Sequence, residues 1–166
     1  MKEFDIVPSL KIKRGAVFDL MGLYKMMREW LDINGLIKNF KEESYGEGTT
    51  PRGKDITIDW TTYHDVSPYV RFKIRVTFLI TGINKVELQR GHKKIEMDKG
   101  NIEIRIDGKV VYDPNDKYKG NFLTFPFTAL YEIKMRKRLD AYKLELYKTL
   151  YAFHKEVKLY LDMHGF

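Results

Sequence analysis

Hydrophobic and polar residues alternate strictly over residues 69–81, and this pattern predicts the clearest strand of the chain. The apolar positions are Val70, Phe72, Ile74, Val76, Phe78 and Ile80. Arg71, Lys73 and Arg75 lie between them. Because successive side chains of a strand point to opposite faces of a sheet, this segment has one buried face and one face in water.

Shorter alternating runs predict further strands on both sides of this one. They cover residues 4–13, 55–63, 85–89, 95–97, 102–106 and 110–112, with 36–45 as an extended arm. Gly82 is expected to open a tight turn, and Asp107-Gly108 is a dipeptide typical of two-residue hairpins. The pattern therefore predicts an antiparallel sheet of five to seven strands.

Two segments show helical spacing instead. Leu20, Leu23, Met27 and Leu31 are three or four residues apart, which predicts a helix over 18–33 that Asn34-Gly35 ends. A second apolar stripe runs from Tyr131 to Tyr160.

The second stripe predicts one long C-terminal helix over about 125–163. Thr124 is expected to cap it, and Pro126 fits its first turn. Such a helix would be roughly 54 Å long, more than one compact sheet can cover. We therefore expect it to project, to kink, or to pack on a second copy, with self-association along its C-terminal half.

The predicted fold is α+β, with both helices packed on the apolar face of the sheet and residues 1–166 as a single domain. The order strand, helix, antiparallel strands, long last helix resembles the helix-grip layout of START-like and Bet v 1-like proteins. That resemblance implies a curved sheet around the last helix with an apolar cavity between them. The segment 46–53 departs from the glycine-rich loop of the Bet v 1 branch, and the last helix is longer than the layout needs.

Composition narrows the class of protein. The chain has 166 residues, no cysteine and a formal net charge of +7. Zero cysteine excludes disulfides, thiolate metal sites and a cysteine nucleophile. The N-terminal ten residues do not resemble a secretory signal and no apolar run has the length of a membrane span, so we expect a cytoplasmic location. The abundance of Lys, Glu, Ile and Tyr is similar to that of heat-adapted and archaeal proteins.

The basic excess lies in the middle and at the end of the chain. Residues 1–50 hold 8 basic and 8 acidic side chains, whereas 51–120 hold 14 and 10 and 121–166 hold 8 and 5. Two basic groups are candidates for phosphate contacts with nucleic acid or with an anionic membrane surface: Arg71, Lys73 and Arg75 on one strand face, and Lys134, Arg136, Lys137 and Arg138 on the last helix. The alternative for both is a surface whose charges pair with each other or serve solubility.

Aromatic residues suggest a different partner. The chain has 10 Phe, 11 Tyr and 2 Trp, and a tyrosine that faces an interior needs an outlet for its hydroxyl group. A cavity that binds a hydrophobic ligand would therefore be lined by Trp60, Phe72, Phe78, Tyr131 and Tyr142. The alternative is that these side chains fill a core or an interface.

Catalytic signals are weak. The four histidines show no metal-ligand spacing, no nucleophile or phosphate-loop motif is present, and no metal or cofactor is predicted. An enzyme would have to use scattered residues, of which Asp59, His64 and Asp65 are the best local group. Asp113 to Asp116 is expected to form a turn rather than a cation site. The sequence favours a non-catalytic binding or scaffold protein that holds a hydrophobic ligand or protein partner, with nucleic-acid binding as the alternative.

Overall fold

A computed structural model of the chain describes residues 1–116 and 125–164. Its centre is a five-stranded sheet in the order β1-β5-β4-β3-β2 in which every neighbouring pair is antiparallel. The strands are β1 (Lys2–Phe18), β2 (Lys41–Thr50), β3 (Gly53–Ser67), β4 (Val70–Arg90) and β5 (Lys93–Tyr112). The predicted α+β fold with an antiparallel sheet is confirmed.

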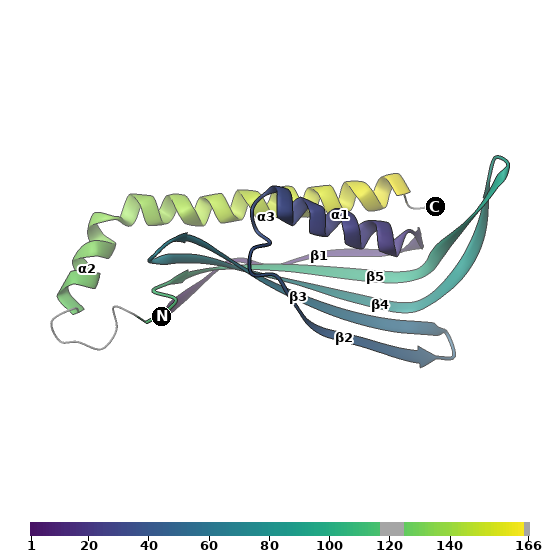
Figure 1. The fold of residues 1–166 in the computed structure, drawn as a ribbon, viewed down its shortest axis with the longest axis horizontal. Coiled ribbons are helices and arrows are strands. Elements are labelled where there is room, and N and C mark those ends of the chain that lie inside the picture. Colours follow the sequence, from purple (N-terminus) through teal and green to yellow (C-terminus); the bar gives the residue numbers. More distant parts are fainter. Residues whose placement is uncertain (117–124, 165–166) are drawn as a thin grey trace.

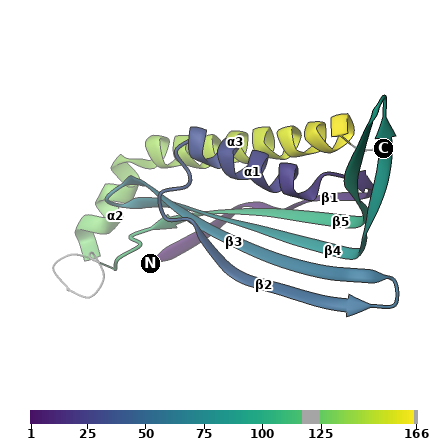
Figure 2. The same cartoon turned by 45° about the vertical axis from the view of Figure 1, so that its right-hand side comes forward.

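Three helices complete the fold: α1 (Leu20–Ile33), α2 (Phe125–Lys134) and α3 (Arg136–His164). Figures 1 and 2 show α1 and α3 side by side on one face of the sheet, while the far ends of β4 and β5 bend toward that same side. None of the described helices lies on the opposite face of the sheet (Figure 1). The sheet therefore has one covered face and one open face, as the strict alternation in β4 predicts.

The covered face holds the core. Every second residue of β4 from Val70 to Ile80 is buried, and Ile102, Ile104 and Ile106 of β5 continue the same apolar layer. From α3, the buried stripe consists of Leu139, Leu146, Leu150, Phe153, Val157 and Leu161. These positions are three, four or seven residues apart, so they share the helix face that lies on the sheet.

The dipeptide Asp107-Gly108 does not form the expected hairpin. It lies inside β5, where Gly108 is opposite Ile74 of β4 and Val7 of β1. A Cβ atom on Gly108 would lie only 2.1 Å from Cδ1 of Leu150. This glycine therefore serves close approach of α3 to the sheet rather than a turn.

Gly82 also lies within a strand rather than at a turn. Its φ of +64° and the register shift between Thr81 and Asn84 identify an irregularity in β4, after which pairing with β5 continues to Arg90. The backbone N–H of Gly82 donates to Oδ1 of Asp55 at 2.8 Å. Runs that the sequence analysis separated at Gly82 and Gly108 are thus two long strands, which explains why the sheet has five strands.

Capping residues define both ends of α1. Asp19 is its N-cap and accepts a hydrogen bond from the N–H of Gly22 at 2.9 Å. Asn34 is its C-cap, and Gly35 follows with a φ of +70°. The predicted stop at Asn34-Gly35 is confirmed, while the predicted start at Phe18 is two residues early because Phe18 ends β1.

The predicted single helix over 125–163 is two helices with a bend at Met135. Figure 1 shows α2 turned down across the end of the sheet, so the expected kink is present. On α2, Tyr131 makes an edge contact with the ring of Tyr69 at 5.0 Å, and Glu132 accepts the Tyr69 hydroxyl at 2.7 Å. The bend places these residues over the end of the sheet. A straight helix would carry them past that end. The expected cap, Thr124, lies outside the described residues.

Candidate functional site

The basic row of β4 is matched by acids on the adjacent strand β3 and on β1, which lies beyond β5. Arg71 donates to both carboxylate oxygens of Asp65, from Nε at 2.5 Å and from a terminal nitrogen at 3.1 Å. Lys73 lies 3.8 Å from Glu3, and Arg75 lies 3.3 Å from Asp59. These three predicted phosphate ligands therefore face carboxylates of their own chain, as the ion-pair alternative expects.

Three further cations of this open sheet face also have carboxylate partners. Lys13 and Arg105 both contact Glu103, at 2.9 and 2.6 Å. Lys109 lies 3.1 Å from Asp5. Hydrogen bonds from the two cations lower the pKa of Glu103, and the bond from Arg71 lowers the pKa of Asp65. The open face of the sheet thus carries six paired cations, while Lys11, opposite Arg105 in the register, has no carboxylate within ion-pair distance among the described residues.

The second predicted group, at the junction of α2 and α3, is different. Lys134, Arg136, Lys137 and Arg138 are all exposed. Arg138 donates from Nε to the hydroxyl of Tyr142 at 2.9 Å and lies over its ring. Among the described residues, no carboxylate lies within ion-pair distance of any of these four cations.

Three more exposed lysines, at positions 148, 155 and 158, continue this row along α3 and were missed by the sequence analysis. They too have no acid partner within the described part of the chain, whereas three acids of α2 and α3 are already engaged. Those acids are Glu132 with Lys2, Asp140 with Lys143 and Asp162 with Arg14. The spacing of Lys148 and Lys155, seven residues or two helical turns, was the available signal.

This gives the helical layer an outer surface that we call the basic ridge, defined as Lys134, Arg136, Lys137, Arg138, Lys148, Lys155 and Lys158. On α3, Lys137, Lys148 and Lys155 lie opposite the buried stripe, whereas Arg136 and Arg138 lie on the two flanks of the helix. Two exposed acids of α3, Glu145 and Glu156, remain beside the ridge. The ridge therefore concentrates the unbalanced positive charge that the sequence analysis assigned to the end of the chain.

The five cavity candidates occupy different environments. Trp60 is buried within ring contact of Tyr24, Phe40 and Phe78, at centroid distances from 4.7 to 5.2 Å. Phe72 and Phe78 are buried in the β4 layer, whereas Tyr131 is 40% exposed. Tyr142 is half-buried and contacts Arg138. Binding of a hydrophobic ligand by these five residues stays a prediction.

Three hollows lined by described residues lie at the surface. They have volumes of about 470, 650 and 450 Å³, and they lie beside α1, at the end of β3 and along β1. None of these three is lined by a cavity candidate. Among the described side chains, no group of three or more His, Asp or Glu could hold a metal ion. None of the described helices combines the length and apolar character of a membrane span.

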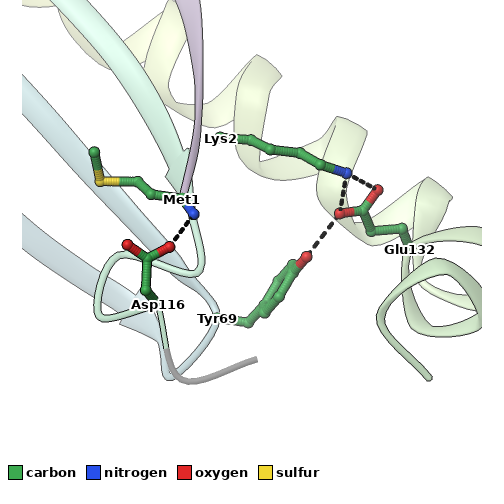
Figure 3. Close-up of polar contacts among 5 residues, drawn as sticks. All are labelled: Met1, Lys2, Tyr69, Asp116 and Glu132. Carbon is green, nitrogen blue, oxygen red and sulfur yellow. Dashed lines mark hydrogen bonds and ion pairs between the residues drawn. The ribbon is translucent and has the colours of Figure 1, made fainter. Parts of the chain in front are cut away.

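Tyr69 centres a polar cluster that sequence reasoning did not identify (Figure 3). Its hydroxyl donates to Glu132, which also accepts two hydrogen bonds of 2.9 Å from Lys2. Burial, followed by the bond to Glu132, raises the pKa of Tyr69. The cluster joins β1, the turn before β4 and α2 through residues far apart in sequence, so it fixes the position of α2 rather than presenting a reactive group.

The candidate catalytic group separates in the structure. His64 pairs with Phe72 in the sheet register and its ring lies 6.2 Å from that ring. Asp65 points to the opposite face, where it binds Arg71, and Asp59 accepts from the hydroxyl of Thr77 at 2.5 Å. Asp113 and Asp116 form the predicted turn, in which the N–H of Asp116 donates to the carbonyl of Asp113 at 3.1 Å.

Comparisons of the chain with protein-family models, with curated proteins and with solved structures find no match.

Proposed function

We propose that the protein is a non-catalytic nucleic-acid-binding protein that contacts phosphates through the basic ridge. The observation that carries the proposal is the difference in pairing between the two basic groups. Six cations of the sheet face have carboxylate partners at 2.5–3.8 Å, whereas the seven of the ridge have none among the described residues. An ammonium or guanidinium group without an internal partner is free to replace a counterion on a phosphate.

The shape of the ridge supports the same proposal. Lys137 and Lys158 are 21 residues apart on α3, which corresponds to about 32 Å at 1.5 Å per residue. A straight row of this length can follow a phosphate backbone over several nucleotides. The supporting stripe of Leu146, Leu150, Phe153 and Val157 is fully buried, so the helix is held rigidly in place. Because the helix is already ordered, its basic residues lose less backbone freedom on binding than those of a flexible tail would.

The test is fluorescence anisotropy with labelled DNA and RNA oligonucleotides at about 50 mM salt. The ridge variant carries Lys134→Ala, Arg136→Ala and Lys137→Ala. The matched control, with the same loss of net charge, carries Arg71→Ala, Lys73→Ala and Arg75→Ala. We expect the ridge variant to bind at least about tenfold more weakly than the wild type, and the control to bind within a few-fold of it.

Two outcomes would contradict the proposal. One is a wild-type protein that binds neither DNA nor RNA at low salt. The other is a control variant that loses as much affinity as the ridge variant, because total charge alone would then explain binding. Circular dichroism of all three proteins establishes that the variants are folded before binding is compared.

Self-association along the C-terminal half of α3 stays a prediction. Leu159 and Met163 are 48% and 65% exposed there. Sedimentation of the wild type and of a Leu159→Lys, Met163→Lys variant tests it, since only a contact through these side chains would be lost in the variant.

A further inference from the structure

Two exposed tyrosines lie on the outer side of α3 within the basic ridge. Tyr147 and Tyr151 are 41% and 42% exposed, and their ring centroids are 4.3 Å apart with an angle of 34° between the ring planes. A hydrogen bond between the two side chains raises the pKa of Tyr147. They form a small aromatic surface in water, whereas most other rings of the chain belong to the core.

Lysines are interleaved with these rings. Lys148 follows Tyr147 directly, and Lys155 lies one helical turn beyond Tyr151. Leu144, which is 52% exposed, precedes the pair by one turn on the same side. The buried stripe of α3, with Leu146 and Leu150, faces the other way. Rings and cations thus share one exposed helix face, which is the combination that contacts both bases and backbone of single strands.

We infer that the ligand of the ridge is single-stranded nucleic acid, with bases stacked on Tyr147 and Tyr151 while Lys148 and Lys155 contact the flanking phosphates. This inference rests on the proposed function. Bases in a duplex have their faces covered by neighbouring base pairs, so an aromatic surface adds affinity only where bases are unstacked. No hydrogen-bond reading of base edges is required, and the preference is therefore for strand state rather than for sequence.

Charge complementarity favours this occupant over the two other classes that an exposed helix face can bind. A second copy packed on the same face would bring the unpaired lysines of both chains together. A membrane-surface helix needs an apolar face with cations at its margins. Here Lys148 and Lys155 lie among the apolar side chains. Single-stranded nucleic acid has both phosphates and exposed base faces, so it can contact the lysines and the tyrosines together.

The experiment compares three labelled probes of about 30 nucleotides. They are oligothymidylate, an abasic deoxyribose-phosphate strand of the same length, and a duplex. The test variant carries Tyr147→Leu and Tyr151→Leu, which keeps apolar volume and removes the rings. The matched control carries Tyr147→Phe and Tyr151→Phe, which keeps the rings. Thermal melting by circular dichroism shows that each variant is folded.

We expect the wild type and the phenylalanine variant to bind oligothymidylate about tenfold more tightly than the abasic strand. The leucine variant is expected to bind both strands alike, with its affinity for the duplex unchanged. An unchanged preference for oligothymidylate in the leucine variant would overturn the stacking inference and leave phosphate binding by the ridge standing. No binding of any of the three probes by the wild type would overturn both.

Discussion

The open face of the sheet and the outer face of α2 and α3 are both rich in lysine and arginine, yet they differ in what surrounds the charges. On the sheet, Arg71, Lys73 and Arg75 face Asp65, Glu3 and Asp59 from adjacent strands or across the sheet. On the basic ridge, seven cations have no such partner among the described residues. The number of basic residues in a segment is therefore a poor guide to the electrostatic potential at its surface, because that potential also depends on where the carboxylates lie.

The physical origin of the difference is the geometry of the two element types. A sheet face brings several strands within about 5 Å of each other, so acids from distant parts of the chain reach its cations. A helix on the outside of the fold has only its own residues within reach, at spacings of three and four. Partners on α2 and α3 are few, since Glu132, Asp140 and Asp162 already bind other cations.

The largest expected effect concerns the contact that holds the ridge on the sheet. Leu150 is fully buried and lies against Gly108, so Leu150→Ala should lower the free energy of unfolding by about 2–5 kcal/mol. Gly108→Ala should cost about 1–3 kcal/mol through overpacking and less in the Leu150→Ala background, where the space is open. Urea unfolding of the four proteins measures this, and strictly additive losses would show that the two sites do not meet.

A second prediction concerns variants in which two cations of the sheet lose their acid partners and are not themselves substituted. Asp59→Asn with Asp65→Asn removes the acid partners of Arg75 and Arg71 and should raise nucleic-acid affinity severalfold. The salt slope should steepen by up to about one unit for each released cation that contacts a phosphate. Glu29→Gln with Asp32→Asn on α1 gives the same change in net charge and is the control. Equal gains in both variants, measured by anisotropy, would favour long-range attraction over pairing.

A third prediction concerns the pH dependence of stability. Hydrogen bonds from Arg71, and from Lys13 and Arg105, lower the folded pKa of Asp65 and Glu103. Their contribution to stability is present above the ordinary carboxyl pKa of about 4 and is lost as the pH falls through the lowered folded values. The urea concentration at the unfolding midpoint of the wild type should therefore decrease when the pH is lowered below about 4.

The control for this prediction is Asp65→Asn with Glu103→Gln. Its midpoint should be lower than that of the wild type at pH 7, and the gap should narrow toward pH 3. A gap that is constant from pH 7 to pH 3 would show that these carboxyls do not contribute through their charge.

The smallest expected effect is the energy of a single sheet pair. A double-mutant cycle with Arg71→Ala and Asp65→Ala should give a coupling of about 0.2–1 kcal/mol, because both side chains are partly in water. Chemical denaturation of the four proteins measures it. A coupling of zero would mean that the pair seen between β3 and β4 does not hold Arg71 in solution.

The sequence predicts the fold better than the site because fold signals are local. The alternation through Val70 to Ile80 and the stop at Asn34-Gly35 depend on neighbours in the chain, and the structure confirms them. The hairpin turn predicted at Asp107-Gly108 was wrong, because glycine is favoured both in a turn and at a strand position that a helix approaches closely. Only the position of Leu150 distinguishes these two uses, and it lies 42 residues later.

The charges could not be assigned from sequence for a related reason. Lys73 and its acid partner Glu3 are 70 positions apart, and only the sheet order brings them together. Tyr69 and Glu132 are likewise joined by the bend before α3. Unpaired cations on α3 were more accessible to prediction, since helical spacing places Lys148 and Lys155 on one face.

The central claim, that unpaired cations on the ridge bind phosphates and paired cations on the sheet do not, is tested most directly by the salt dependence of binding. The measurement is the slope of log affinity against log salt for oligothymidylate, with wild type, the Lys134→Ala, Arg136→Ala, Lys137→Ala variant and the Arg71→Ala, Lys73→Ala, Arg75→Ala variant. We predict that the ridge variant loses about 0.7 units of slope for each phosphate contact removed, while the sheet variant keeps the wild-type slope. Equal losses of slope in the two variants would contradict the account.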